Sequence, residues 1–288
     1  MKDALDTYID SIDHLPPTPT VVVRLISLFR KPDRDLDEVV SVMSLDPSLT
    51  AEVLRRCNSA FYGGEEQVID VFDAIMRVGF YEVYQTAVAW FGQQAISRGP
   101  KTPGLEAELL WRHSAITAVA SGQVGKKMGE AQWGPFTAGL LHDIGKVALS
   151  SAEGTKYASV VSKAGRFGPA LDHEEKESFG FGHSEVGARL LHRWGVPLEI
   201  SMPVFFHHYS AWPENYERSC AMVNLGNLVA HHIELGGAAD MDLAPAEAAM
   251  AELGLGGNDL IEIANLTQAE LATLDGMFNF GKPAKTAA

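Results

Sequence analysis

A histidine and an aspartate stand side by side in the stretch AGLLHDIGKVALS, residues 138–150, where most of the neighbours are apolar. An imidazole nitrogen and a carboxylate oxygen are both ligands that borderline and hard divalent metals accept. A metal held by His142 and Asp143 could lower the pKa of a bound water and direct that water at a phosphorus atom. Lys146, one helical turn after His142, could meet an anionic ligand in the same cavity.

Most of the ten histidines lie between residues 113 and 232. Apolar spacing predicts a helix around each of these histidines, and one continuous helix through the stretch 138–150. Neighbouring residues point about 100° apart around a helix. One metal could therefore touch both members of the His-Asp pair only over the seam between their faces, with its other ligands on other helices. The candidates are His113 in LWRHSAITAVA, His183 in FGHSEVGARLLHRWG, and His207 with His208 in VFFHHYS.

Each of these residues also has an ordinary structural alternative. A histidine in an apolar helix is more often a hydrogen-bonded core residue than a ligand, and we expect that role for His192, His231 and His232. Asp143 could be the ion-pair partner of Lys146 or Arg112, and the pair at 207–208 could end a helix, where imidazolium complements the dipole. The whole set, with its members on separate helices of one lobe, favours a shared polar site.

The elements that must position these residues are predicted to be helices almost throughout, because apolar residues recur three and four apart rather than alternating. Thr20 is expected to cap the first strong helix, and Asp35 and Asp46 mark the starts of helices over 36–44 and 47–58. Two further helices are expected near 245–253 and 258–278. Asn58 is expected to act as a cap or turn residue at the end of the helix over 47–58.

The run SRGPKTPG, residues 97–104, holds two prolines and two glycines and is the best candidate for a lobe boundary. We therefore predict three parts: an N-terminal helical lobe over 1–100, a helical lobe with the histidine cluster over 101–235, and a C-terminal helical extension with a loose tail over 236–288.

The net charge of −14 argues against an extensive nucleic-acid surface and against docking on an anionic membrane. The two cysteines, Cys57 and Cys220, form no metal-binding motif, which is typical of a reducing compartment. The first residues are acidic where a signal peptide would be basic, and no 18 apolar residues run together. We expect a cytoplasmic protein that neither spans nor binds membranes.

Several motifs together resemble the HDOD family, the HD-related output domain of the HD superfamily. They cover about residues 14–235 and are LPPTPTVVVRLISLF, SLDPSLTAEVLRRCNSAFYGG, DAIMRVGF, LWRHSAITA, AGLLHDIGK and ESFGFGHSEVGARLLHRWGVP. The resemblance implies an all-α fold of two lobes, the second an HD-type helical bundle. Family members are regarded as bacterial signalling modules, often joined to receiver domains, and most have no established enzymatic activity.

We expect one or two divalent metals or an empty site, and the mixed nitrogen and oxygen donors favour iron, manganese, zinc or magnesium over copper(I). In active HD enzymes a second aspartate completes the site, whereas the matching stretch AMVNLGNLVAHH offers Asn227, with Asn224 nearby. A neutral amide is a poorer ligand, so both metal affinity and water activation should fall. No DGxGYP stretch follows residue 208, which argues against cyclic di-GMP phosphodiesterase activity. The metal positions carried over are His113, His142, Asp143, His183, His207 and His208.

The preferred hypothesis is a response-regulator-type output module that acts through contacts with signalling proteins, tuned by a metal or a small anionic nucleotide. The alternative is a metal-dependent phosphohydrolase of nucleotides or cyclic nucleotides, with His142 and Asp143 as core ligands and Lys146 near the phosphate. A third hypothesis is a scaffold whose histidine cluster is empty. In SAFYGG, Phe61 and Tyr62 either pack a turn against the other lobe or form a partner-docking surface.

Overall fold

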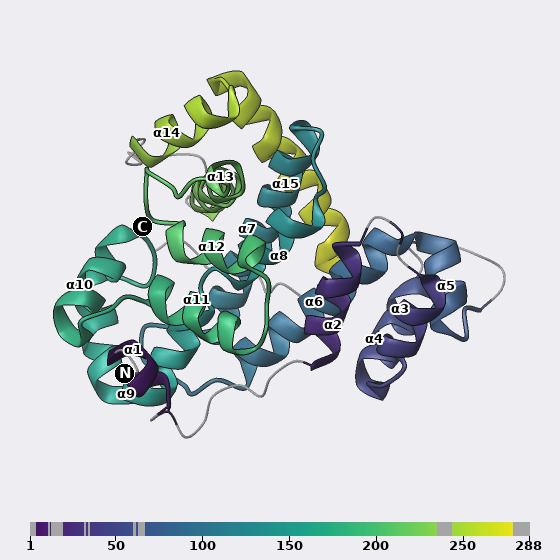
Figure 1. Cartoon of the computed structure of the whole chain (residues 1–288), viewed down its shortest axis with the longest axis horizontal. Coiled ribbons are helices and arrows are strands. Elements are labelled where there is room, and N and C mark those ends of the chain that lie inside the picture. The colour runs from purple at the N-terminus through teal and green to yellow at the C-terminus, as the bar shows by residue number, and fades with distance from the viewer. Residues whose placement is uncertain are drawn as a thin grey trace.

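The protein is described by a computed structural model at residues 4–10, 12, 20–31, 33, 35–59, 62, 67–234 and 244–278. Within these ranges every regular element is a helix, and the sole β-type contact is an isolated bridge between Thr102 and Leu105 (Figure 1). The all-α prediction is confirmed. None of the described helices is both long enough and apolar enough to cross a bilayer.

The N-terminal helices are α1 (Ala4–Asp10), α2 (Thr20–Phe29), α3 (Leu36–Met43), α4 (Pro47–Cys57), α5 (Val71–Val78) and α6 (Phe80–Ser97). The central helices are α7 (Ala107–Lys127), α8 (Trp133–Leu141), α9 (Ile144–Ala164), α10 (Pro169–Phe179), α11 (His183–Arg193), α12 (Leu198–Phe206) and α13 (Glu217–Glu234). The C-terminal helices are α14 (Ala244–Leu253) and α15 (Gly257–Phe278).

The N-cap residues predicted from the sequence mark the starts of two early helices correctly. The carboxylates of Asp35 and Asp46 accept backbone N–H groups at the starts of α3 and α4, as predicted. Thr20 is the first described residue of α2 and already helical, so it is not the cap of that helix. Asn58 ends α4, and its side-chain amide exchanges two 2.8 Å hydrogen bonds with the backbone of Val68. The last residues of the predicted loose tail, 279–288, lie outside the described residues.

Helix α6 joins two hydrophobic cores. Val83 and Ala87 belong to a small core built with α2 to α5, whereas Tyr84 and Val88 belong to the main core around α7 to α12. In Figure 1, α3, α4 and α5 form a lobe on the right, apart from the helices that carry the histidines. Helix α1 packs on α11, so the N-terminus reaches the main core. The division at 1–100, 101–235 and 236–288 stays a prediction.

Helices α9 and α11 cross at very close range, and two glycines permit it. A Cβ added to Gly145 would lie 1.9 Å from the backbone oxygen of His183 and 2.7 Å from the backbone nitrogen of Gly187. Both of these are backbone atoms that no side-chain rotation can move away. The glycine of HDIGK therefore brings the start of α11 against the start of α9.

Replacing Gly145 with alanine should push α11 off α9 and lower the free energy of unfolding by about 3 kcal/mol. Gly134→Ala on α8 is the matched control, because its Cβ would have no heavy atom within 4 Å, and helix propensity alone should leave stability equal or slightly higher. Denaturant unfolding of both variants measures this. Equal stability of the two variants would contradict the close crossing.

Candidate metal centre

His142 and Asp143 lie at a junction between two helices. Helix α8 ends at Leu141 and α9 begins at Ile144, with Asp143 at φ −98° and ψ 8° between them. The prediction of one continuous helix through residues 138–150 is wrong, because this backbone geometry ends one helix and starts the next. As a result the two side chains need not lie 100° apart, and both can face one space.

Four of the predicted residues surround the carboxylate of Asp143. Its Oδ1 lies 3.3 Å from Nε2 of His183 and 3.8 Å from Nε2 of His207. Its Oδ2 lies 3.4 Å from Nε2 of His142 and 2.7 Å from the Lys146 ammonium. All of these side chains are at most 1% exposed. The cluster therefore forms around one buried negative charge.

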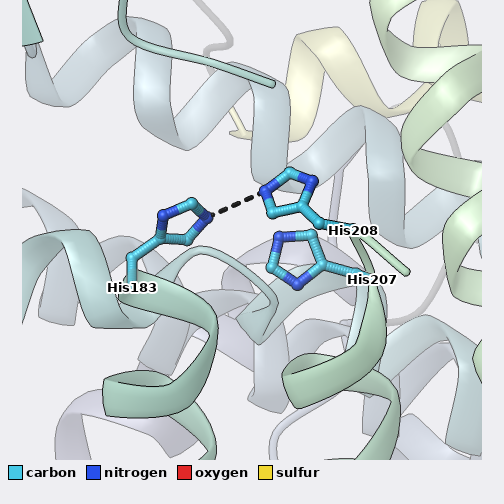
Figure 2. Close-up of side chains that lie close together, drawn as sticks. All are labelled: His183, His207 and His208. Carbon is cyan, nitrogen blue, oxygen red and sulfur yellow. Dashed lines mark hydrogen bonds between the residues drawn. The ribbon is translucent and has the colours of Figure 1, made fainter. Parts of the chain in front are cut away.

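Two more predicted histidines extend the cluster. Figure 2 shows His208 reaching over His207 to His183, with 3.1 Å between the Nε2 atoms of His208 and His183. On the opposite side, the ring of His113 lies 5.2 Å from that of His142, centroid to centroid. Donor atoms of His113, His142 and Asp143 all fall within 4.8 Å of one another. The structure thus brings together all six predicted metal positions.

Backbone carbonyls fix the orientation of two of these imidazoles. Nδ1 of His142 donates to Gly139 O at 2.7 Å, and Nδ1 of His207 donates to Val204 O at 2.6 Å. A carbonyl oxygen can only accept, so the proton is on Nδ1 and the lone pair is on Nε2. Among the described residues, neither Nε2 has a hydrogen-bond partner, and the same holds for Asp143 Oδ1.

For two other histidines, the acceptor behind the ring is a carboxylate instead of a backbone carbonyl. Nδ1 of His183 donates to Glu175 at 2.6 Å, and Nδ1 of His113 donates to Glu234 at 2.9 Å. Glu175 is fully buried and also accepts the Tyr157 hydroxyl and the backbone N–H of His183, both at 2.6 Å. A carboxylate behind a histidine is the usual outer partner of a metal ligand.

These carboxylates were not predicted from the sequence. Glu175 precedes His183 by eight residues and lies on a different helix, so only the turn between α10 and α11 brings them together. His231 lies with its ring centroid 4.7 Å from that of His113 and is partly buried at the edge of the cluster. The core role expected for His192 is wrong, because its side chain is exposed on α11.

The donor set fits a divalent metal ion. Two ligand atoms that each lie about 2.1 Å from one ion are about 3.0–3.4 Å apart at right or tetrahedral angles. The contacts of His183 Nε2 with His208 Nε2 and with Asp143 Oδ1, at 3.1 and 3.3 Å, fall within this spacing. Buried lone pairs without hydrogen-bond partners complete the fit, since such atoms are costly unless they bind something.

The sequence matches the HDOD domain family model over residues 15–210. The chain belongs to the HDOD domain family. This assignment confirms the resemblance, and it agrees with solved structures of the same fold. An HDOD domain protein of unknown function from Geobacter sulfurreducens superposes with a TM-score of 0.78 at 23% identity, covering 96% of this chain and 97% of that one.

Two further relatives show how the HDOD chain compares in length. A candidate signal transduction protein from Marinobacter aquaeolei VT8 has a TM-score of 0.77 at 21% identity, covering 97% of this chain and 62% of that one. An uncharacterized protein of Treponema pallidum (strain Nichols) is 26% identical over 231 residues, 78% of this chain but 44% of that protein. The chain thus spans less than half the length of this second relative.

Helix α13 of the HDOD chain carries two buried asparagines, Asn224 and Asn227. The side-chain amide of Asn224 donates to the backbone oxygens of His207 and Tyr209 at 3.0 and 3.3 Å, which holds the end of α12 in place. Asn227 follows one turn later, and its buried Oδ1 has no hydrogen-bond partner among the described residues. Its role as a replacement for the last aspartate stays a prediction.

Charge partners stabilise the carboxylate in this HDOD domain. Burial alone would raise the pKa of Asp143, but the Lys146 ammonium and the hydrogen bond with His183 outweigh burial and hold that pKa well below its usual range. Lys146 also donates to Arg166 O at 3.1 Å. The structure therefore pairs Lys146 with Asp143, one of the alternatives read from the sequence, and a contact of Lys146 with an anionic ligand stays a prediction.

The histidines of the site differ in their protonation. Burial lowers the pKa of His142, and it lowers those of His207 and His208 well below the usual value, so all three imidazoles are neutral near pH 7. Burial also acts to lower the pKa of His183, but the Glu175 carboxylate and the bond to Asp143 outweigh it and raise that pKa to about 9. Metal binding by His183 must therefore release a proton.

The aromatic pair of the HDOD N-terminal lobe is only partly described, because Phe61 lies outside the described residues. Tyr62 is half-buried, packs against the main core and donates its hydroxyl to Glu82 at 2.8 Å. This geometry matches the packing alternative for Tyr62. A partner contact by Phe61 or Tyr62 stays a prediction.

We expect the metal-free protein to lose stability from pH 7 to pH 5. The pKa values of His142, His207 and His208 lie below the unfolded value of about 6.5, so below that pH the unfolded chain binds more protons and the free energy of unfolding falls. The opposite contribution of His183 changes between about 6.5 and about 9, so only the top of this window, above about pH 6.5, is affected by it. Denaturant unfolding with a chelator at both pH values measures the loss.

Two variants test whether the cluster causes this loss. His207→Gln should reduce it by up to about 1.4 kcal/mol per pH unit, the value of one proton. The exposed His192→Gln should leave it unchanged. The same pH dependence in both variants would show that the buried histidine contributes nothing.

Proposed function

We propose that this HDOD chain is a cytoplasmic signal-transduction module that acts through protein contacts and holds a divalent metal in its histidine site as a regulatory ion. One observation supports a metal site. The Nδ1–H groups of His142, His183 and His207 all donate hydrogen bonds to acceptors behind the rings, and the Nε2 atoms of these rings converge on Asp143. Ring nitrogens held in this way are arranged for ligation.

The residues divide into two sides of the Asp143 carboxylate. His183, His207 and His208 lie on the Oδ1 side, where one ion would be held. His142 lies on the Oδ2 side, where the Lys146 ammonium already makes a 2.7 Å ion pair. Iron, manganese or zinc suits this mixture of imidazole and carboxylate, and magnesium suits it less. A bound ion of this kind acts as a Lewis acid and lowers the pKa of bound water.

Three features favour binding over turnover. His142, Asp143, His183 and His207 are between 0% and 2% exposed, and only His208 is partly buried, so a phosphate ester does not reach the four inner ligands without rearrangement of the helices. Lys146 neutralises one oxygen of Asp143. The late helix provides the amide of Asn227 in the proposed position of a carboxylate, and an amide gives a bound ion less negative charge.

A bound ion would connect elements that are distant in the sequence. Its ligands come from the α8–α9 junction, from the start of α11 and from the end of α12. An ion that binds only the folded state raises the free energy of unfolding, and this gain grows with the logarithm of the ion concentration above Kd. Helix α8 packs on α6, and α6 packs on α4 and α5. Metal occupancy would thereby strengthen the packing that leads to the N-terminal lobe.

The test is metal analysis of tag-free protein purified without chelator, with thermal unfolding and a turnover screen. We expect about one ion per chain, a melting temperature raised by Mn²⁺ or Zn²⁺, and no hydrolysis of nucleotides or cyclic nucleotides. Asp143→Ala should abolish the metal-dependent shift, and the exposed His192→Ala should retain it. Turnover that is lost in Asp143→Ala would establish the phosphohydrolase alternative. Absence of metal binding would favour the third hypothesis, a scaffold with an empty histidine cluster.

Glu175→Gln should weaken metal binding about 10- to 100-fold, because an amide oxygen polarises the His183 imidazole less than a carboxylate does. Glu174→Gln is the matched control on the same helix, since Glu174 pairs with Lys163 at the surface. Competition with a chromophoric chelator measures both affinities. Equal affinities in a wild-type protein that binds metal would show that Glu175 has only a structural role.

A further inference from the structure

Helix α5 carries a row of exposed apolar side chains on one side. Ile69, immediately before the helix, is 74% exposed, Phe72 is 42% exposed and Met76 is 67% exposed. Phe72 and Met76 are four residues apart within the helix and so lie along one face, and Ile69 directly precedes the Asp70 cap of that helix. The opposite face packs into the small core through Val71, Ala74 and Ile75. We call Ile69, Phe72 and Met76 the α5 stripe.

The stripe lies away from the histidine site. The main packing partners of α5 are α3, α4 and α6, and Figure 1 shows α5 at the outer end of the small lobe. Other exposed large apolar residues on the described helices, Leu198, Ile261 and Leu266, belong to α12 and α15. Three such residues within eight positions are an apolar patch of the kind that marks interaction sites.

The lobe around the stripe is strongly acidic. Residues 33–82 contain eleven acidic and four basic residues, so this segment holds a net charge of −7, half of the total of −14. Asp70 and Asp73 are exposed beside the stripe, at the start of α5. One of the four basic residues, Arg56, is buried and adds little positive charge at the surface.

The negative charge around the stripe disfavours some possible binding partners and favours others. A second copy of the chain would bring one acidic lobe against another, and like charges across an interface oppose association. Nucleic acids and anionic membranes are repelled for the same reason. A helix with an apolar side flanked by lysine or arginine matches both the stripe and its acidic surroundings.

We propose that the α5 stripe docks a basic amphipathic helix of a partner protein. The partner's apolar side would cover Ile69, Phe72 and Met76, and its cations would lie near Asp70 and Asp73. Methionine adapts its shape to different partners, and an aromatic anchor supplies much of the binding energy in such contacts. This inference rests on the proposed signalling function, for which it supplies the contact surface.

The test selects peptides against the full-length protein from two displayed libraries of helices about 18 residues long, five turns. Both libraries vary the apolar residues at positions i, i+3, i+4 and i+7. Their remaining positions are lysine and arginine in one library, and aspartate and glutamate in the other. We expect binders from the basic library alone, with affinity that falls as salt rises.

Single substitutions then locate the binding site. Phe72→Ala and Met76→Ala should each lower the affinity for the selected peptide at least about tenfold, the usual effect of removing an interface anchor. The control is Ile261→Ala, an equally apolar residue that is 62% exposed on α15, and it should bind as the wild type does. Circular dichroism checks that the variants fold, which exposed positions should permit.

Several results would overturn the proposal. They are the absence of binders from the basic library, equal binding from the acidic library, and affinity that both stripe variants retain. Sedimentation that shows a dimer lost in Phe72→Ala would assign the stripe to a second copy instead. The variants also separate the two proposals, because Phe72→Ala should still bind metal and Asp143→Ala should still bind the peptide.

Discussion

The buried carboxylate of Asp143 is the constraint on which the rest of the centre depends. A charge removed from water is stable only if partners surround it. The partners here are the Lys146 ammonium, 2.7 Å away, and the protonated His183, whose Nε2 lies 3.3 Å from Oδ1. To supply them, the chain ends α8 before the carboxylate, begins α9 after it, and brings α11 close to α9 at Gly145.

The same constraint explains the outer shell of acceptors. Each imidazole must present a particular nitrogen, and an acceptor behind the ring determines which one. Two rings use the carbonyl three residues before them in the chain, Gly139 for His142 and Val204 for His207. His183, at the first turn of α11, uses the side chain of Glu175 on α10 instead. The shell therefore joins local helix geometry to tertiary packing.

The sequence predicts the fold class, several helix starts and the histidines of the site. It does not predict the helix break at the HD pair or the role of Glu175, and both failures have a physical reason. Helix starts at Asp35 and Asp46 follow from local hydrogen bonds, and the all-α fold follows from periodicity. The break at the HD pair was missed because the apolar spacing continues through it, although a buried charge and a non-helical backbone interrupt the helix. The role of Glu175 depends on a turn between helices, and no spacing rule encodes it.

The central claim is that the inward Nε2 atoms and Asp143 Oδ1 bind one divalent ion. Anomalous X-ray diffraction from crystals grown with Mn²⁺ or Zn²⁺ tests it most directly, because the method locates the ion among its ligands. We expect a peak about 2.0–2.3 Å from Nε2 of His183 and His207 and from Asp143 Oδ1. A peak only at the protein surface, or none in the cluster at saturating metal, would contradict it.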